Sequence, residues 1–185
     1  MDNRFFTFVA GNSGPWSVVK VDAIVGPSLE AAPCIDVQNA NRLELPQDAR
    51  WMLRGVTSNQ RYVTRQEQAA LVAFQPQLGR PEATCAALIP LTKSAKWWAL
   101  TQEERREILE DRSTHIATGL RFLPAIARKL HHSRELGEPF DFITWFEFAP
   151  ADEPLFDELV AALRRTEEWN YIEREVDIRL IRNNT

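Results

Sequence analysis

The feature that most constrains this fold is an abrupt change of hydrophobic periodicity at Pro124. Before it, Thr101 and Glu104 form a capping-box pattern ahead of helix-forming residues, which predicts one helix over residues 101–119 that Gly119 ends. A helix cannot run on through the proline without losing a backbone hydrogen bond, because proline lacks the N–H. The chain is therefore expected to change from helix to strand within a few residues.

Two strands are predicted after the proline. Residues 126–132 alternate between two faces, and residues 140–148, FDFITWFEF, are rich in the aromatic and β-branched residues that favour strands. The turn ELGEP between them predicts an antiparallel pair. One face of the first strand would carry Ile126, Arg128, Leu130 and His132, and one face of the second Phe142, Thr144, Phe146 and Phe148.

The flanking segments complete a recognisable order. Residues 84–91 are an apolar run of strand length, and residues 171–181 alternate apolar and charged residues. Between these ends, residues 152–169 predict a helix whose apolar positions are Leu155, Leu159, Val160 and Leu163. The order β-α-β-β-α-β is that of a ferredoxin-like fold, with both helices on one face of an antiparallel sheet.

The first 80 residues read as a reduced version of the same unit. They predict strands at 4–10, 16–21 and 51–63, the last with a bend at Gly55, a connecting loop over 27–48 and a helix over 64–74. We therefore predict an α+β chain with a reduced ferredoxin-like half over residues 1–80 and a complete ferredoxin-like half over residues 81–185.

Composition excludes several classes of protein. The formal net charge of -4 and the absence of a basic block argue against nucleic-acid binding. Cys34 and Cys85 are too few for a disulfide scaffold and form no C-x-x-C motif, so free thiols in a reducing compartment are expected. No apolar run has the length of a signal peptide core or a membrane span. These patterns predict a cytoplasmic protein that does not enter membranes.

Two charged residues have both ordinary and functional interpretations. His115 would lie in the last turn of the predicted helix, where an imidazolium is compatible with the helix dipole. Arg128 lies on an otherwise apolar strand face, so its charge must be paired, solvated in a cavity or directed at an anion. Glu147 and Glu168 are the two carboxylates best placed to reach inward, although most such glutamates are solvated.

The pair Trp97–Trp98 leaves two possibilities open. Adjacent tryptophans are commonly core or interface anchors. With Lys93 nearby, they can also form the floor of a pocket for a large planar acid.

Taken together, these segments resemble the haem-binding half of the chlorite dismutase family. The resemblance covers about residues 84–170 and rests on KSAKWWALTQEERR, the spacing of His115 and Arg128 around Pro124, RKLHHS, FDFITWFEF and LVAALRRTEEW. It implies a dimeric α/β-barrel fold that binds haem b. The roles that it implies are His115 as proximal iron ligand, Glu168 as the carboxylate on its other ring nitrogen, Arg128 as distal arginine, Lys93 and Trp97 as propionate ligands, and Trp98 packing beside them.

The same resemblance implies an activity and a partner. Chlorite would be converted to chloride and dioxygen through a ferryl-oxo intermediate and transient hypochlorite, so chlorite and other small anions are the expected ligands. The short N-terminal half is similar to that of the truncated, dimeric branch of the family. A homodimer would also cover the apolar face of residues 140–148, which we expect to be exposed on a ferredoxin-like sheet.

Three alternatives compete with this interpretation. A coproheme decarboxylase of the same superfamily uses a tyrosine near the pocket and typically lacks the distal arginine. Here the only tyrosines are Tyr62 and Tyr171, both outside the Trp97–Trp98 segment, which favours the dismutase. A haem peroxidase could use Arg128 to polarise peroxide. The third alternative is a non-catalytic ferredoxin-like dimerisation module with the tryptophans at its interface.

Overall fold

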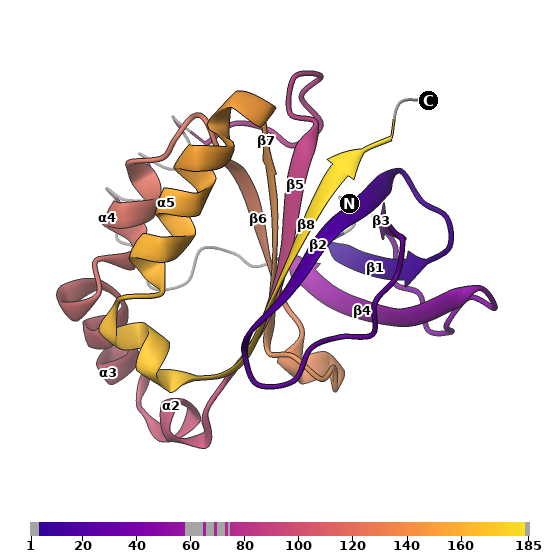
Figure 1. Ribbon diagram of the computed structural model, residues 1–185. Coiled ribbons are helices and arrows are strands. Elements are labelled where there is room, and N and C mark those ends of the chain that lie inside the picture. The colour runs from indigo at the N-terminus through magenta and orange to yellow at the C-terminus, as the bar shows by residue number, and fades with distance from the viewer. Residues whose placement is uncertain (1–3, 58–64, 66–68, 70–72, 74, 184–185) are drawn as a thin grey trace.

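The computed structural model describes all residues except 1–3, 58–64, 66–68, 70–72, 74 and 184–185. Within this part of the chain, antiparallel strands close into a barrel in the order β1-β3-β2-β8-β5-β7-β6-β4 (Figure 1). The strands are β1 (Phe5–Gly11), β2 (Trp16–Val25), β3 (Cys34–Gln38), β4 (Ala49–Thr57), β5 (Cys85–Lys93), β6 (Ala127–His132), β7 (Phe142–Phe148) and β8 (Ile172–Arg182).

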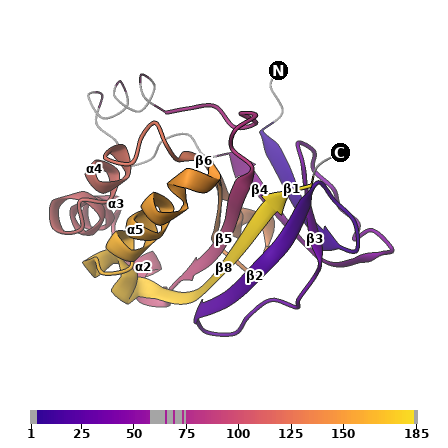
Figure 2. The same cartoon turned by 45° about the horizontal axis from the view of Figure 1, so that its top comes forward.

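The second half has the predicted β-α-β-β-α-β order. Helices α2 (Ala95–Ala99), α3 (Gln102–Arg106) and α4 (His115–Leu120) connect β5 to β6, and α5 (Glu153–Leu163) connects β7 to β8. Figures 1 and 2 show α3, α4 and α5 together on one side of the sheet, with β1, β3 and β4 on the other. The sheet therefore has a helix-covered face and a face that lines the barrel interior.

The prediction of one helix over residues 101–119 is wrong. The capping box is present, since Thr101 and Glu104 exchange side-chain hydrogen bonds with each other's backbone N–H. However, α3 passes into a π-helical segment, η1 (Glu107–Arg112), and Thr114 then adopts the left-handed region at φ 50°. His115 is consequently the first residue of α4 and not part of a last helical turn, and α4 ends at Leu120, one residue beyond the predicted Gly119.

A hydrogen bond to a side chain explains why the helix breaks. The buried carboxylate of Glu110 accepts the backbone N–H of Ile116, which in a continuous helix would donate to a backbone carbonyl. A β-branched residue such as Thr114 is strained in the left-handed region, so the surrounding contacts must hold it there.

The helix predicted over residues 152–169 is also shorter than expected. Helix α5 ends at Leu163, and a separate 3-10 turn, η4 (Glu167–Tyr171), carries Glu168. Leu155 is exposed, and Phe156 takes its place in the core because its ring packs 5.0 Å from Phe146 and 4.6 Å from Phe148, measured between ring centroids. No helix among the described residues is long and apolar enough to cross a membrane.

The N-terminal half is only partly as predicted. Strands β1, β2 and β4 match the expected strands, but β3 lies inside the stretch predicted as a loop. This short strand contains one fully buried residue, Ile35, so its sequence alternates too weakly to be recognised. The end of the strand expected over 51–63 and most of the helix expected over 64–74 lie outside the described residues. Of that helix only residues 65, 69 and 73 are described, and these are helical.

Strand pairing joins the two predicted halves into one barrel. β2 pairs with β8, and β4 pairs with β6, so each half completes the sheet of the other. Position 55 within β4 requires a glycine, because a Cβ atom there would lie 2.5 Å from the Cβ of His131. The division at residue 80 remains a prediction, since the pairing neither marks nor excludes it.

The apolar face of residues 140–148 is not exposed, which corrects the argument that a partner must cover it. β7 lies between β5 and β6 in the sheet, and the barrel interior covers Ile143 and Trp145. Helix α5 covers Phe146 and Phe148 on the opposite face. A reason for dimerisation must come from another surface.

Buried His131 makes stability depend on pH. Its side chain is 1% exposed, and this burial lowers its pKa from 6.5 to about 4. Between pH 4 and pH 6.5, His131 therefore carries a proton in the unfolded chain but not in the folded chain. The free energy of unfolding should fall by about 3 kcal/mol as the pH drops from 6.5 to 4.

Denaturant unfolding of the His131→Phe variant at several pH values checks this expectation. The variant should lose that part of the pH dependence, whatever its stability at pH 7. Parallel pH curves for the two proteins would show that His131 is not the titrating group.

Candidate functional site

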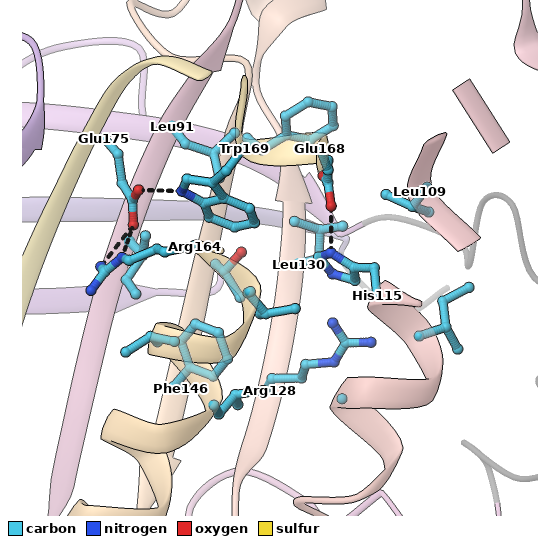
Figure 3. A pocket seen from close by; sticks show the side chains of 18 of the residues that line it. Leu91, Leu109, His115, Arg128, Leu130, Phe146, Arg164, Glu168, Trp169 and Glu175 are labelled. Atoms are coloured by element: carbon cyan, nitrogen blue, oxygen red, sulfur yellow. Dashed lines mark hydrogen bonds and ion pairs between the residues drawn. The ribbon is translucent and has the colours of Figure 1, made fainter. Parts of the chain in front are cut away.

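A cavity of about 330 Å³ lies between the helices and the sheet. Its walls are largely apolar, and the alternation of β6 and β7 directs one set of side chains into it, as predicted. Figure 3 shows side chains from α4, β6 and α5 around this space. The strand residues that line it include Ile126, Arg128, Leu130, His132, Phe142, Thr144 and Phe146.

A histidine and two buried charges meet at one side of the cavity. The His115 Nδ1 lies 2.6 Å from Oε2 of Glu168, and Lys93 Nζ lies 2.6 Å from Oε1 of the same carboxylate. Burial alone would raise the pKa of Glu168, but the charges and hydrogen bonds of His115 and Lys93 lower it to about 2. The carboxylate is thus ionised at neutral pH, and it fixes Nδ1 as the protonated nitrogen of His115.

Glu168 is held at this position from its backbone as well. Its N–H donates to Oγ of Ser113, which lies between η1 and Thr114. The break in the helix therefore serves the site, since it brings both Ser113 and His115 beside η4. The predicted pairing of His115 with Glu168 is present.

Lys93 lies deeper than its predicted role as a propionate ligand suggests. The side chain is 4% exposed. Its Nζ forms an ion pair with Glu168 and lies 4.2 Å from the ring centroid of Trp97. Burial lowers the pKa of Lys93, while the adjacent Glu168 opposes this shift. As placed, the ammonium holds the carboxylate that orients His115.

The two tryptophans differ in their surroundings. Trp97 is buried and contacts Tyr171 edge-on, with the ring centroids 5.5 Å apart. Trp98 stacks on Phe142, donates its Nε1–H to Asp141 and has the guanidinium carbon of Arg134 at 3.8 Å from its ring centroid. Both line the cavity, Trp97 as part of its wall and Trp98 closer to solvent.

Arg128 extends from β6 into the same cavity as His115, and Figure 3 shows the two side chains directed toward the same part of it. Within the described part of the chain, its guanidinium has no ion pair, and its apolar surroundings lower its pKa. A guanidinium is effectively always protonated in proteins, so the group remains charged at neutral pH. An unpaired guanidinium in an apolar cavity is suited to binding an anion.

Several residues of the site were not identified from sequence. Gln75 lines the cavity and donates to the backbone carbonyl of Arg128 at 2.7 Å.

Glu175, 1% exposed, accepts hydrogen bonds from Arg164 and from Trp169 Nε1, which fixes the Trp169 ring in the wall. Asp141 accepts the backbone N–H of Lys93 at 2.7 Å. An acid inside the apolar segment FDFITWFEF was the available signal for Asp141.

Glu147, the other carboxylate considered as a partner of His115, lies on the opposite face of β7. Its carboxylate accepts the indole N–H of Trp145 and the backbone N–H of Gly79. It does not line the cavity that contains His115.

The fold and site define an α+β barrel protein in which one apolar cavity contains a carboxylate-oriented histidine and an arginine with no ion pair to the described residues. The model of the chlorite dismutase family matches residues 39–182, and the chain belongs to this family. Members of the family bind haem as a class.

Three relatives show how far the similarity extends. The dimeric chlorite dismutase of Nitrobacter winogradskyi is 55% identical, covers 96% of this chain and 99% of its own, and superposes with a TM-score of 0.90. The chlorite dismutase of Ideonella dechloratans is 33% identical over 139 residues, which are 71% of this chain but only 45% of that protein. The chlorite dismutase of Candidatus Nitrospira defluvii, in complex with imidazole, shares the fold at 21% identity, 97% and 91% coverage, and a TM-score of 0.68.

The residues present fit a haem group. Because Nδ1 of His115 is occupied by Glu168, Nε2 is the nitrogen left for iron. The walls offer the apolar surface that a macrocycle requires, formed by residues such as Ile89, Leu130, Phe146 and Trp169.

Glu168→Gln should leave haem bound but raise the ferric/ferrous potential, because a neutral amide makes the imidazole a weaker donor. Activity should fall by about 10–100-fold, as is typical when a residue that supports a metal ligand is lost. Spectroelectrochemistry measures the potential, and Glu147→Gln is the matched control, expected to change neither quantity.

The substitution also removes the counter-charge of buried Lys93, which by itself could destabilise the protein. The double variant Lys93→Met/Glu168→Gln removes that unpaired charge. An unchanged potential in both variants would show that Glu168 does not act on the imidazole.

Proposed function

We propose that this chain is a haem b-dependent chlorite dismutase that converts chlorite to chloride and dioxygen. The observation that carries the proposal is the joint presence, in one apolar cavity, of a carboxylate-oriented imidazole and a guanidinium that has no ion pair with any described residue. Membership of the chlorite dismutase family and the similarity to the Nitrobacter protein support it.

Each residue has a distinct role in this proposal. His115 Nε2 would hold the iron, with Glu168 and Lys93 fixing the imidazole behind it. The bound haem iron would supply the oxygen-transfer chemistry. Arg128 would bind chlorite and retain hypochlorite until both oxygen atoms leave as dioxygen, because a guanidinium stays charged in a cavity where electrostatic interactions are strong. Trp97 and Trp98 remain the proposed residues for the propionate side, whereas the ammonium of Lys93 is engaged by Glu168.

The reaction is balanced without an external reductant. One chlorite ion supplies both oxygen atoms of one dioxygen molecule and leaves as chloride. The protein's task is therefore to keep the chlorine oxyanion in place between the two oxygen transfers. An arginine that no carboxylate neutralises suits this task better than a paired one.

The test uses purified protein loaded with haem b. A Soret band should be present, and chlorite should yield dioxygen at an oxygen electrode and chloride by ion chromatography in equal amounts. Bound haem with no dioxygen from chlorite would contradict the proposal. Peroxide-dependent oxidation of a dye without dioxygen release would favour a peroxidase, and loss of carboxyl groups from coproheme would favour a decarboxylase.

The structure bears on two of the alternatives. Among the described residues, no tyrosine lines the cavity, which does not favour the decarboxylase. Trp97 is 3% exposed and packs inside the protein, so it cannot act as the interface anchor of a dimerisation module. These two observations favour the dismutase over the decarboxylase and the dimerisation module.

We also propose that the protein is a homodimer, as the Nitrobacter structure is described. The outer side of β2 and β8 carries exposed Val19 and Ile181, and no helix drawn in Figure 2 lies over β2. Large apolar side chains exposed together often mark an interface. Light scattering should give twice the 21.2 kDa chain mass.

Val19→Glu should shift the protein toward monomers, because the interface would then bury a charge. Leu43→Glu is the control, since Leu43 is 75% exposed but lies between β3 and β4. A monomeric wild type, or a mass near five chains, would contradict the proposed dimer.

A further inference from the structure

The backbone that carries His115 is held by a carboxylate of the preceding segment. Helix α4 begins at His115, but its N-cap residue, Thr114, makes no side-chain hydrogen bond to the first turn. The buried carboxylate of Glu110 supplies that acceptor instead, because its Oε1 accepts the N–H of Ile116, the second residue of α4. An N-cap side chain normally accepts the N–H at this position or the next. Glu110 therefore caps α4 from outside the helix.

The main chain of Glu110 also ends the preceding segment. Its carbonyl accepts the N–H groups of Ser113 and Thr114, the latter at 2.9 Å. One residue thus closes η1 and caps α4, and between them the chain passes through Thr114 in the left-handed region. Threonine is strained in that region, so the break persists only while contacts on both sides hold it.

Three hydrogen bonds join this segment and the site into a closed loop. The N–H of Ile116 donates to Glu110. The ring of the preceding residue, His115, contacts Glu168 at 2.6 Å (Figure 3). The backbone N–H of Glu168 in turn donates to Oγ of Ser113 at 3.0 Å, and Ser113 lies three residues after Glu110. A displacement of α4 would therefore separate the imidazole from its carboxylate.

We propose that Glu110 is a positioning residue for the iron ligand: through the N–H of Ile116 it holds α4 so that the imidazole of His115 meets Glu168. The inference rests on the proposed function, in which His115 holds the iron. Without this acceptor, residues 107–120 would relax toward a continuous α-helix, in which Ile116 donates to the carbonyl of Arg112. His115 would then lose its hydrogen bond to Glu168 and become a weaker donor to iron.

The test measures the iron–histidine stretching band of the ferrous, haem-loaded protein by resonance Raman spectroscopy. A carboxylate on Nδ1 strengthens the iron–histidine bond, so Glu110→Ala should lower the band frequency and weaken haem binding by about tenfold, the low end of losses behind a metal ligand. Glu110→Gln should match the wild type in both, because its amide oxygen still accepts the Ile116 N–H. Asp111→Ala is the control, since Asp111 is the next residue but is exposed.

A second substitution tests whether Glu110 acts through the break at Thr114. Glycine adopts the left-handed region without strain, so the double variant Glu110→Ala/Thr114→Gly should recover part of the lost haem affinity and move the band back toward the wild-type frequency. If Glu110→Ala does not fold, Glu110→Asp, whose carboxylate is one methylene shorter, takes its place in every comparison.

The outcomes separate this proposal from the proposed function. An unchanged band in the Ala or Asp variant, a lowered band in Glu110→Gln, or no recovery in the double variant would overturn the role of Glu110 and leave His115 as the iron ligand. Bound haem with the band but no dioxygen from chlorite would contradict the proposed function alone. A wild-type protein without the band would contradict both.

Discussion

His115→Ala should abolish tight haem binding, whereas His131→Ala and His132→Ala should leave it intact. Only His115 combines a position in the cavity between the helices and the sheet with a buried carboxylate on one ring nitrogen, which leaves Nε2 for iron. His131 lies on the barrel side of the sheet and does not line the cavity that contains His115. His132 lines that cavity from β6, with its ring against Phe142 at 4.8 Å between centroids, so it is the more demanding control.

The affinity for haem b should fall by roughly 100-fold or more, beyond the ~10–100-fold typical when only a residue behind the ligand is lost. Haem titration followed at the Soret band measures this in all three variants. Added imidazole should restore the band to His115→Ala, because the space and Glu168 remain. A His115 variant with undiminished haem affinity would assign the iron to another residue.

The strand arrangement could be predicted where alternation is strong. Arg128, Leu130 and His132 share a face, and the barrel side carries His131, because the period of a strand is two residues regardless of its tertiary contacts. The same reasoning failed for β3, in which only Ile35 is fully buried. Closure of the barrel was not visible either, since it depends on pairing of β2 with β8 and β4 with β6, far apart in sequence.

The helical region was harder to predict because helix propensities give no sign of its break. Residues 102–112 contain no proline or glycine, and threonine has no preference for the left-handed region that Thr114 adopts. The break is stabilised by the hydrogen bond from Ile116 to Glu110, which becomes apparent only when both groups are placed. The error mattered, because it put His115 at the wrong end of its helix.

The site itself was predicted where a residue type was unusual for its position. A charged Arg128 on an apolar face is such a signal, and Glu168 followed from the resemblance to the family. Gln75 and Glu175 carry no comparable signal, since a glutamine near a loop and a glutamate in an alternating strand are ordinary. Gln75 contacts Arg128, 53 positions away in the sequence, and Glu175 contacts Arg164, 11 positions away.

Arg128→Ala should retain haem but lower the rate of chlorite decomposition by about 10²–10³, the usual cost of removing one preorganised charge stabiliser. Without the guanidinium, hypochlorite should escape before the second oxygen transfer and bleach the haem. Oxygen release, hypochlorite trapping with a chlorination probe and loss of the Soret band during turnover measure the three effects together.

Arg128→Lys separates charge from geometry in the same position. A lysine keeps the positive charge but lacks the planar pair of donors, so it should bind chlorite yet release more hypochlorite than the wild type. Arg121→Ala is the control, because Arg121 follows α4 and its side chain is 66% exposed. If Arg128→Ala turned over chlorite at the wild-type rate with no additional bleaching, the unpaired guanidinium would have to serve another anion, and oxygen formation would have to depend on the remaining cavity residues alone.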